Sequence, residues 1–168
     1  MKLISGNIIS AMSRLNRESK LKYIKELFIK EMNSKRMDSL LELLLDAMSI
    51  FFVLNPDFRR NIDNFRAKYT FRIGNNGSGA SVVFSPLERI KYGRMIVKTD
   101  PIDDADVSVT FESGRAMAEF LFSESPDIFA ALLDNKLSFS GNLNYLFKFA
   151  YMAKHLPKTL GIEIPAAA

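Results

Sequence analysis

Cysteine and tryptophan are absent from the 168 residues of the chain, and histidine occurs once, at His155. Without cysteine there is no disulfide, no thiolate metal site and no cysteine nucleophile. A single histidine excludes any site that needs two, and no Gly-x-Ser-x-Gly motif supplies a nucleophile elbow. The sequence therefore predicts no catalytic residue, no metal site and no cofactor, and it weighs against an enzyme.

Long apolar runs are also missing. The start of the chain has no sustained apolar stretch before Arg14, and the longest uninterrupted one, 47–54, is far shorter than a bilayer-spanning helix. The last three residues, 166–168, match neither a peroxisomal nor an endoplasmic reticulum signal. From these features we expect a soluble cytoplasmic protein.

Acidic residues are scarce at the N-terminus. Residues 1–36 hold nine Lys or Arg against three Asp or Glu, whereas the rest of the chain is slightly acidic. Such a segment suits nucleic acid, an acidic partner or an anionic membrane, and it is equally typical of a solvated helix face. Because acids are interleaved with the basic residues, we expect no nucleic-acid binding.

Two helices are predicted in the first third of the chain. Apolar residues recur at helical spacing over 19–32, with lysines and a glutamate four apart on another face. The segment 39–54 carries two apolar stripes and a thin polar strip, which predicts a helix that is buried or packed on two partners. Asn55-Pro56-Asp57 ends it and begins a short helical turn.

Strand periodicity begins near Phe65. Alternating or apolar runs predict five strands, at 69–73, 80–84, 94–98, 107–111 and 137–139. The glycine-rich segment 74–79 lacks a following Gly-Lys-Ser/Thr, so we interpret it as a hairpin turn and not as a phosphate loop. Four aspartates in 100–106 lack the spacing of an EF-hand and are interpreted as a solvated loop.

Three further helices are predicted in the last third. One begins near Gly114, and the next begins with Ser125 as its N-cap and ends at Asn135, which tolerates a left-handed conformation. The final helix covers 143–156 and is expected to end at Pro157. The predicted order is therefore four strands, two helices, a strand and a helix, after the N-terminal helices.

Two segments resemble the sterol carrier protein type 2 family. Ala105–Phe111 is similar to the strand that enters the core motif of that family. Ile128–Asn142 is similar to the helix, Gly-Lys-Leu strand and Gly-Asp or Gly-Asn turn that precede its final helix. Asn135 stands where the family usually has glycine, a mild departure because asparagine also tolerates this helix end. The resemblance extends over about 65–156.

The resemblance implies an α+β fold. It consists of a five-stranded, mainly antiparallel, curved sheet that helices cover on one face, with residues 1–60 as a helical extension and 61–168 as the lipid-binding domain. It also implies an apolar tunnel between the two layers. Members of the family bind fatty acids, acyl-CoA esters, sterols and other isoprenoids there.

Phenylalanine and methionine are abundant, at 14 and 8 residues, and they suit either a packed core or a surface for irregular apolar guests. With the resemblance, they suggest a lipid site whose lining residues come from both ends of the chain. The candidates are Met48, Phe51, Phe52, Phe111, Met117, Phe120, Leu121, Phe129, Leu132, Leu133, Leu137, Phe139, Leu146, Phe147, Ala150 and Tyr151.

Two functions are consistent with these observations. The first is non-enzymatic lipid binding or transfer, with helix 19–32 touching anionic membranes and helix 39–54 either roofing the cavity or forming a homodimer. The second is an accessory protein with a collapsed cavity, which serves an enzyme of lipid or isoprenoid-quinone synthesis.

Overall fold

The computed structural model describes residues 16–33, 37–74, 79–87, 90–122 and 127–160. Its elements are α2 (Arg17–Asn33), α3 (Met37–Leu54), α4 (Pro56–Arg59), η1 (Arg60–Ile62), β1 (Ala67–Ile73), β2 (Gly79–Leu87), β3 (Ile90–Lys98), β4 (Val107–Phe111), α5 (Gly114–Phe122), α6 (Ile128–Leu133), β5 (Leu137–Gly141) and α7 (Leu143–Leu160). This order confirms the predicted one. No described helix combines the length and apolar composition that crossing a bilayer requires.

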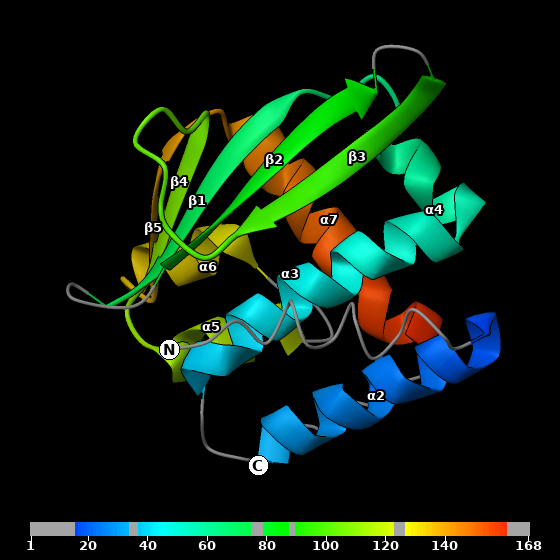
Figure 1. The fold of residues 1–168 in the computed structure, drawn as a ribbon. Coiled ribbons are helices and arrows are strands. Elements are labelled where there is room, and N and C mark those ends of the chain that lie inside the picture. The colour runs from blue at the N-terminus through cyan, green and yellow to red at the C-terminus, as the bar shows by residue number, and fades with distance from the viewer. Residues whose placement is uncertain (1–15, 34–36, 75–78, 88–89, 123–126, 161–168) are drawn as a thin grey trace.

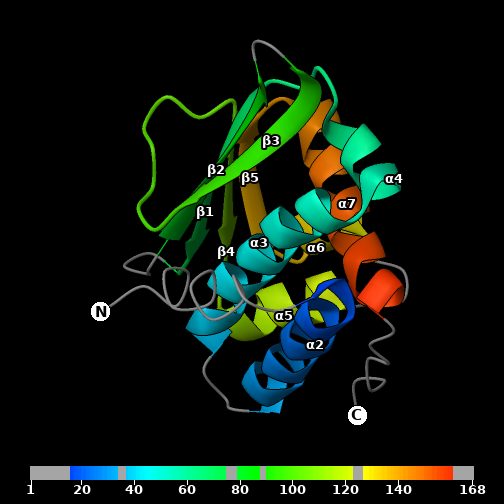
Figure 2. The ribbon, with the colours of Figure 1, turned by 45° about the vertical axis from the view of Figure 1, so that its right-hand side comes forward.

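The sheet has five strands in the order β3-β2-β1-β4-β5. Three neighbouring pairs are antiparallel, and the pair of the central strand β1 with β4 is parallel. The helices lie on one face of this twisted sheet (Figures 1 and 2). The α+β class and the mainly antiparallel sheet covered on one face are therefore confirmed.

Helix α3 lies between the sheet and α2. It packs against β2, β3, α5 and α7, whereas the neighbour that contributes most to the packing of α2 is α3 (Figure 1). Residues on most sides of α3 are buried, including Leu44, Leu45 and Met48, as its two apolar stripes predict. α3 is thus an inner helix of the core and α2 an outer one.

The opposite face of the sheet carries the loop between β3 and β4, seen on the far side from the helices in Figure 2. The hydroxyl of Thr70 accepts a hydrogen bond from the backbone N–H of Ile102 and donates one to its carbonyl. Lys68 forms an ion pair with Asp104, and Ser81 donates to the carbonyl of Asp100. The acidic loop is therefore fastened to the sheet by side chains of β1 and β2.

Several predicted boundaries were wrong. Strand β2 continues through Pro86 to Leu87, where it pairs with β3 alone and its register shifts, because pairing with β1 ends at Phe84. Proline is tolerated at such a bulged, one-sided position. Helix α7 continues through Pro157 to Leu160, since proline removes one hydrogen bond but need not end a helix this close to its last turn. The N-cap of α6 is Asp127, whose carboxylate accepts from the N–H of Ala130, and not Ser125.

Other local predictions were confirmed. Asn135 follows Asp134, the C-cap of α6, and has a φ of 56°, the left-handed conformation expected at this helix end. β1 and β2 form an antiparallel hairpin, although residues 75–78 of its turn lie outside the described part of the chain.

The polar strip of α3 contains a buried carboxylate. Asp46 is 7% exposed, and its burial, together with the nearby charge of Glu42, raises its pKa to about 6. A raised carboxyl pKa means that folding favours the protonated form. The contribution of Asp46 to stability is therefore most favourable below about pH 4 and declines as the pH rises through 6.

Replacing Asp46 by asparagine removes the free-energy cost of burying a charged carboxylate at high pH. We expect Asp46→Asn to raise the free energy of unfolding by about 2 kcal/mol at pH 8 and to change little at pH 4. Urea unfolding across this pH range measures the effect. The same substitution at the exposed Asp103 is the control and should have little effect at either pH. A gain that is equal at both pH values would contradict a role for the charge of Asp46.

Candidate functional site

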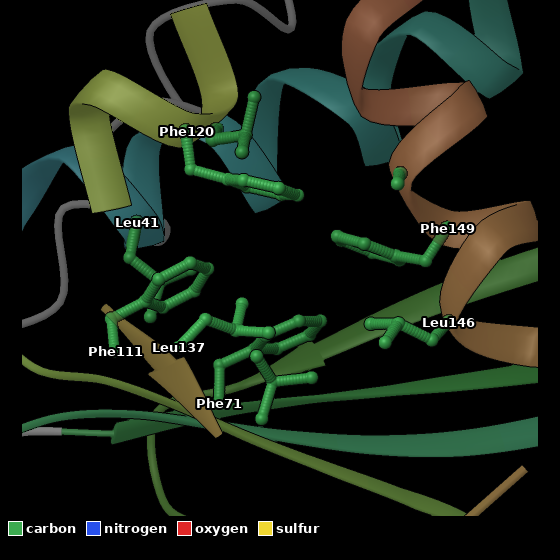
Figure 3. A pocket seen from close by; sticks show the side chains of 10 residues that line it. Leu41, Phe71, Phe111, Phe120, Leu137, Leu146 and Phe149 are labelled. Carbon is green, nitrogen blue, oxygen red and sulfur yellow. The ribbon is translucent and has the colours of Figure 1, made fainter. Parts of the chain in front are cut away.

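A small cavity lies between the sheet and the helices, and Figure 3 shows it from close by. Its volume is about 20 Å³, roughly the space of one water molecule. All of its lining side chains are apolar: Leu41, Leu44, Phe71, Val109, Phe111, Phe120, Leu137, Leu146, Phe149 and Ala150. A cavity this apolar holds no ordered water, since water there would lack hydrogen-bond partners.

Strand register builds the floor of the cavity. Phe71 of β1 lies opposite Val109 of β4, and Phe111 of β4 lies opposite Leu137 of β5. Side chains alternate between the two faces of a strand, so these four point to the helix-covered side together. In Figure 3 the side chains of Phe71, Phe111 and Leu137 point from the sheet toward the helices.

Three helices form the roof. Leu41 and Leu44 come from α3, Phe120 from α5, and Phe149 from α7. Aromatic pairs close the space, because the ring centroid of Phe149 lies 4.6 Å from that of Phe71, and those of Phe111 and Phe120 are 6.1 Å apart. α3 therefore roofs the cavity with one face, and most of its other described apolar residues are buried within the same chain, whereas Val53 is 72% exposed.

A groove on the outer surface lies beside this cavity, between α6 and α7. Its volume is about 330 Å³, and it is lined by Asp127, Ile128, Phe129, Phe147, Ala150, Tyr151 and Lys154. The rings of Phe129 and Phe147 lie 5.9 Å apart, although Phe129 is 58% exposed. Ala150 lines both spaces, so a single residue of α7 lies between the groove and the cavity.

Polar groups near the cavity are already bonded. The buried hydroxyl of Tyr69 donates to the carbonyl of Tyr145 at 2.9 Å, and burial raises the pKa of Tyr69. The ammonium of Lys148 lies 3.9 Å from the ring centroid of Phe65, and burial lowers the pKa of Lys148. In the described part of the chain, no buried side-chain N or O atom lacks a hydrogen-bond partner. The interior thus offers packing surface but no orphaned polar anchor.

The sixteen predicted lining residues are divided among several places. Five line the cavity, namely Phe111, Phe120, Leu137, Leu146 and Ala150. Phe129, Phe147 and Tyr151 line the outer groove, which Ala150 also borders. Met48, Phe51, Phe52 and Met117 are buried in the core away from the cavity lining. Leu132 and Phe139 are partly buried, Leu133 is exposed, and the side chain of Leu121 lies outside the described ones.

Five residues of the cavity were not predicted: Leu41, Leu44, Phe71, Val109 and Phe149. The alternation of Phe71 and Val109 with polar neighbours signalled an inward direction, but only the pairing of β1 with β4 shows that they lie side by side. The cavity formed by the described residues is also much smaller than the tunnel that the resemblance implies. Its aromatic side chains fill most of the space between the layers.

Comparisons with known proteins show the fold. No family model and no curated protein matches the chain. Among solved structures, the chain is similar to a "UbiJ-SCP2 Ubiquinone synthesis protein", with a TM-score of 0.51 and 17% identity over 71% of this chain and 88% of that one. The architecture is therefore that of a sterol carrier protein 2 domain, as the resemblance predicts.

Two further structures are similar to a lesser degree. A conserved hypothetical protein of Thermus thermophilus, described as "possibly sterol carrier protein", has a TM-score of 0.46 at 15% identity, over 76% of this chain and 92% of that one. The sterol carrier protein domain 2 of Helicoverpa armigera has a TM-score of 0.46 at 17% identity, over 80% of this chain and 97% of that one.

Proposed function

We propose that the chain is a non-enzymatic lipid-binding protein that accommodates an acyl or isoprenoid chain between its sheet and its helices. The observation that carries this proposal is that a wholly apolar cavity and a surface groove share one lining residue, Ala150. Small-molecule sites are concave, mostly apolar and a few hundred Å³ in volume, a size that the groove has and the cavity lacks. The sterol carrier protein 2 fold supports the same conclusion.

Binding in the interior requires the cavity to open. A lipid chain must separate contacts such as that between Phe71 and Phe149, whose loss costs free energy. Each methylene removed from water contributes about 0.8 kcal/mol, so ten of them contribute about 8 kcal/mol. We infer that a long chain offsets the cost of opening and a short one does not.

Membrane contact through α2 remains part of this proposal. The helix presents Lys22 and Lys30 to solvent, and their charge favours an anionic surface. Lys22 is also paired with Glu26 at 3.9 Å, which reduces the net charge on this side. We therefore expect this contact to be transient and sensitive to salt.

A substitution at the junction tests lipid binding. Extraction of the purified full chain, followed by mass spectrometry, should reveal bound lipid, and a fluorescent long-chain fatty acid should bind and be displaced by lipid. Ala150→Phe places a large side chain between groove and cavity, and we expect it to weaken probe binding at least about tenfold. The control is Ala130→Phe on the exposed side of α6, which should bind normally. No lipid and no probe binding in the unaltered chain would refute the proposal.

A second candidate is an accessory protein for an enzyme of lipid or isoprenoid-quinone synthesis. Two observations favour it, the cavity of only about 20 Å³ and the similarity to a protein named for ubiquinone synthesis. Because α3 supplies core residues such as Leu44 and Met48, deleting residues 1–60 would damage the fold, so the test uses the full chain. Capture of a lipid- or quinone-synthesis enzyme by a chain that binds no lipid would support this candidate.

A further inference from the structure

We infer that the groove between α6 and α7 selects amphiphiles with an anionic head, which Lys154 binds while the apolar chain passes Ala150. This inference rests on the proposed function and names its ligand class. The groove joins an apolar wall of Phe129, Phe147 and Tyr151 to one ammonium group, that of Lys154. Such a combination fits a molecule that is apolar along its length and negatively charged at one end.

The charge of Lys154 is available in this groove. Its side chain is partly buried, and no carboxylate of the described residues lies within ion-pair distance of it. The carboxylate that lines the same groove, Asp127, already accepts the N–H of Ala130 at 3.0 Å as the N-cap of α6. An incoming carboxylate or phosphate therefore meets a cation that forms no ion pair with a described acid, although the Asp127 carboxylate lines the same groove.

Other lysines near the helix layer are differently engaged. Lys136 pairs with Glu119 at 3.9 Å, and Lys148 lies over the ring of Phe65. Neither lines the groove, so neither can select its ligand.

The apolar interior favours a ligand whose charged head stays in the groove and whose chain enters the cavity. Every residue that lines the cavity is apolar, so a charged head would lose its hydration there without compensation. The head thus remains at the groove, where the long side chain of Lys154 can follow the apolar wall and keep its ammonium at the water boundary. The tail enters at Ala150. A neutral sterol or isoprenoid has no group for Lys154 and binds without this contribution.

Two probes with the same apolar chain, one with a charged head and one with a neutral head, test the inference in the full-length chain. They are a fluorescent long-chain fatty acid and its methyl ester, titrated into the unaltered protein, Lys154→Gln and Lys136→Gln. We expect the unaltered protein to bind the acid about tenfold more tightly than the ester, because a hydrogen bond to a charged group strengthens binding by about this factor. Lys154→Gln should lose this preference through weaker acid binding with ester binding unchanged. Lys136→Gln should retain it.

Displacement experiments identify the head group. A fatty acid and a lysophosphatidic acid should each displace the acid probe, because both present an anion on an apolar chain. Displacement by millimolar inorganic phosphate alone would overturn the inference, since it would show an anion site that needs no chain. Equal binding of acid and ester, or equal weakening of both by Lys154→Gln, would also overturn it while leaving lipid binding intact. Failure of both probes to bind the unaltered protein would overturn the inference and the proposed function together.

Discussion

Replacing Gly93 by alanine is expected to lower the free energy of unfolding by about 3 kcal/mol or more. Gly93 lies in β3 where that strand crosses η1, and a Cβ atom there would lie 1.9 Å from the carbonyl oxygen of Ile62. The obstacle is backbone, which cannot rotate away as a side chain would. The N–H of Gly93 also donates to the carboxylate of Asp63 at 3.2 Å, so the displaced strand would lose a hydrogen bond.

Urea unfolding of Gly93→Ala and Arg94→Ala measures this effect. Arg94 is the adjacent, exposed residue of the same strand, and its replacement should change the free energy of unfolding by less than about 1 kcal/mol. If Gly93→Ala were as stable as the unaltered chain, β3 and η1 could not approach each other as closely as described.

Replacing Phe149 by alanine is expected to cost about 3–5 kcal/mol of stability. Phe149 is almost completely buried on α7, and its ring contacts those of Tyr69 and Phe71 with centroids 5.3 and 4.6 Å away. Its removal extends the existing cavity toward the centre of the core. The enlarged space remains apolar, so it should stay dry and admit a small apolar molecule.

Phe147→Ala is the matched control, on the same helix two residues earlier. Its ring is on the groove side and partly exposed, so we expect a loss of less than about 1 kcal/mol. Thermal unfolding with and without benzene tests whether the enlarged cavity admits a small apolar molecule. Benzene should raise the unfolding temperature of Phe149→Ala alone. Equal destabilisation by the two variants would show that the faces of α7 are not those described.

Local sequence patterns predicted the elements well where one face is buried. In β4 the alternation of Val107, Val109 and Phe111 with polar residues corresponds directly to alternating burial. Boundaries were less predictable at proline. A proline ends a strand or helix only where its missing N–H was needed for a hydrogen bond, and β2 and α7 continue through Pro86 and Pro157. The pairing of β1 with β4 depends on contacts between residues far apart in the sequence, which no local period contains.

The candidate site was harder to predict because α7 is apolar around much of its circumference. Leu146, Phe147, Ala150 and Tyr151 form one plausible stripe, but the structure buries Leu146, Phe149, Met152, Ala153 and Leu156. With phenylalanine on both sides, the helical period does not decide which face enters the core. α6 has only six residues, too few for a period to orient Phe129 outward in advance.

The position of α3 in the chain has a consequence for synthesis of the protein. Of its neighbours, β2, β3, α5 and α7 all follow it in sequence, and α7 is the last described element. A growing polypeptide therefore carries an incompletely covered apolar helix until α7 has left the ribosome. Chains that stall or are truncated before α7 should bind chaperones or aggregate, whereas chains that include α7 can bury α3 at once.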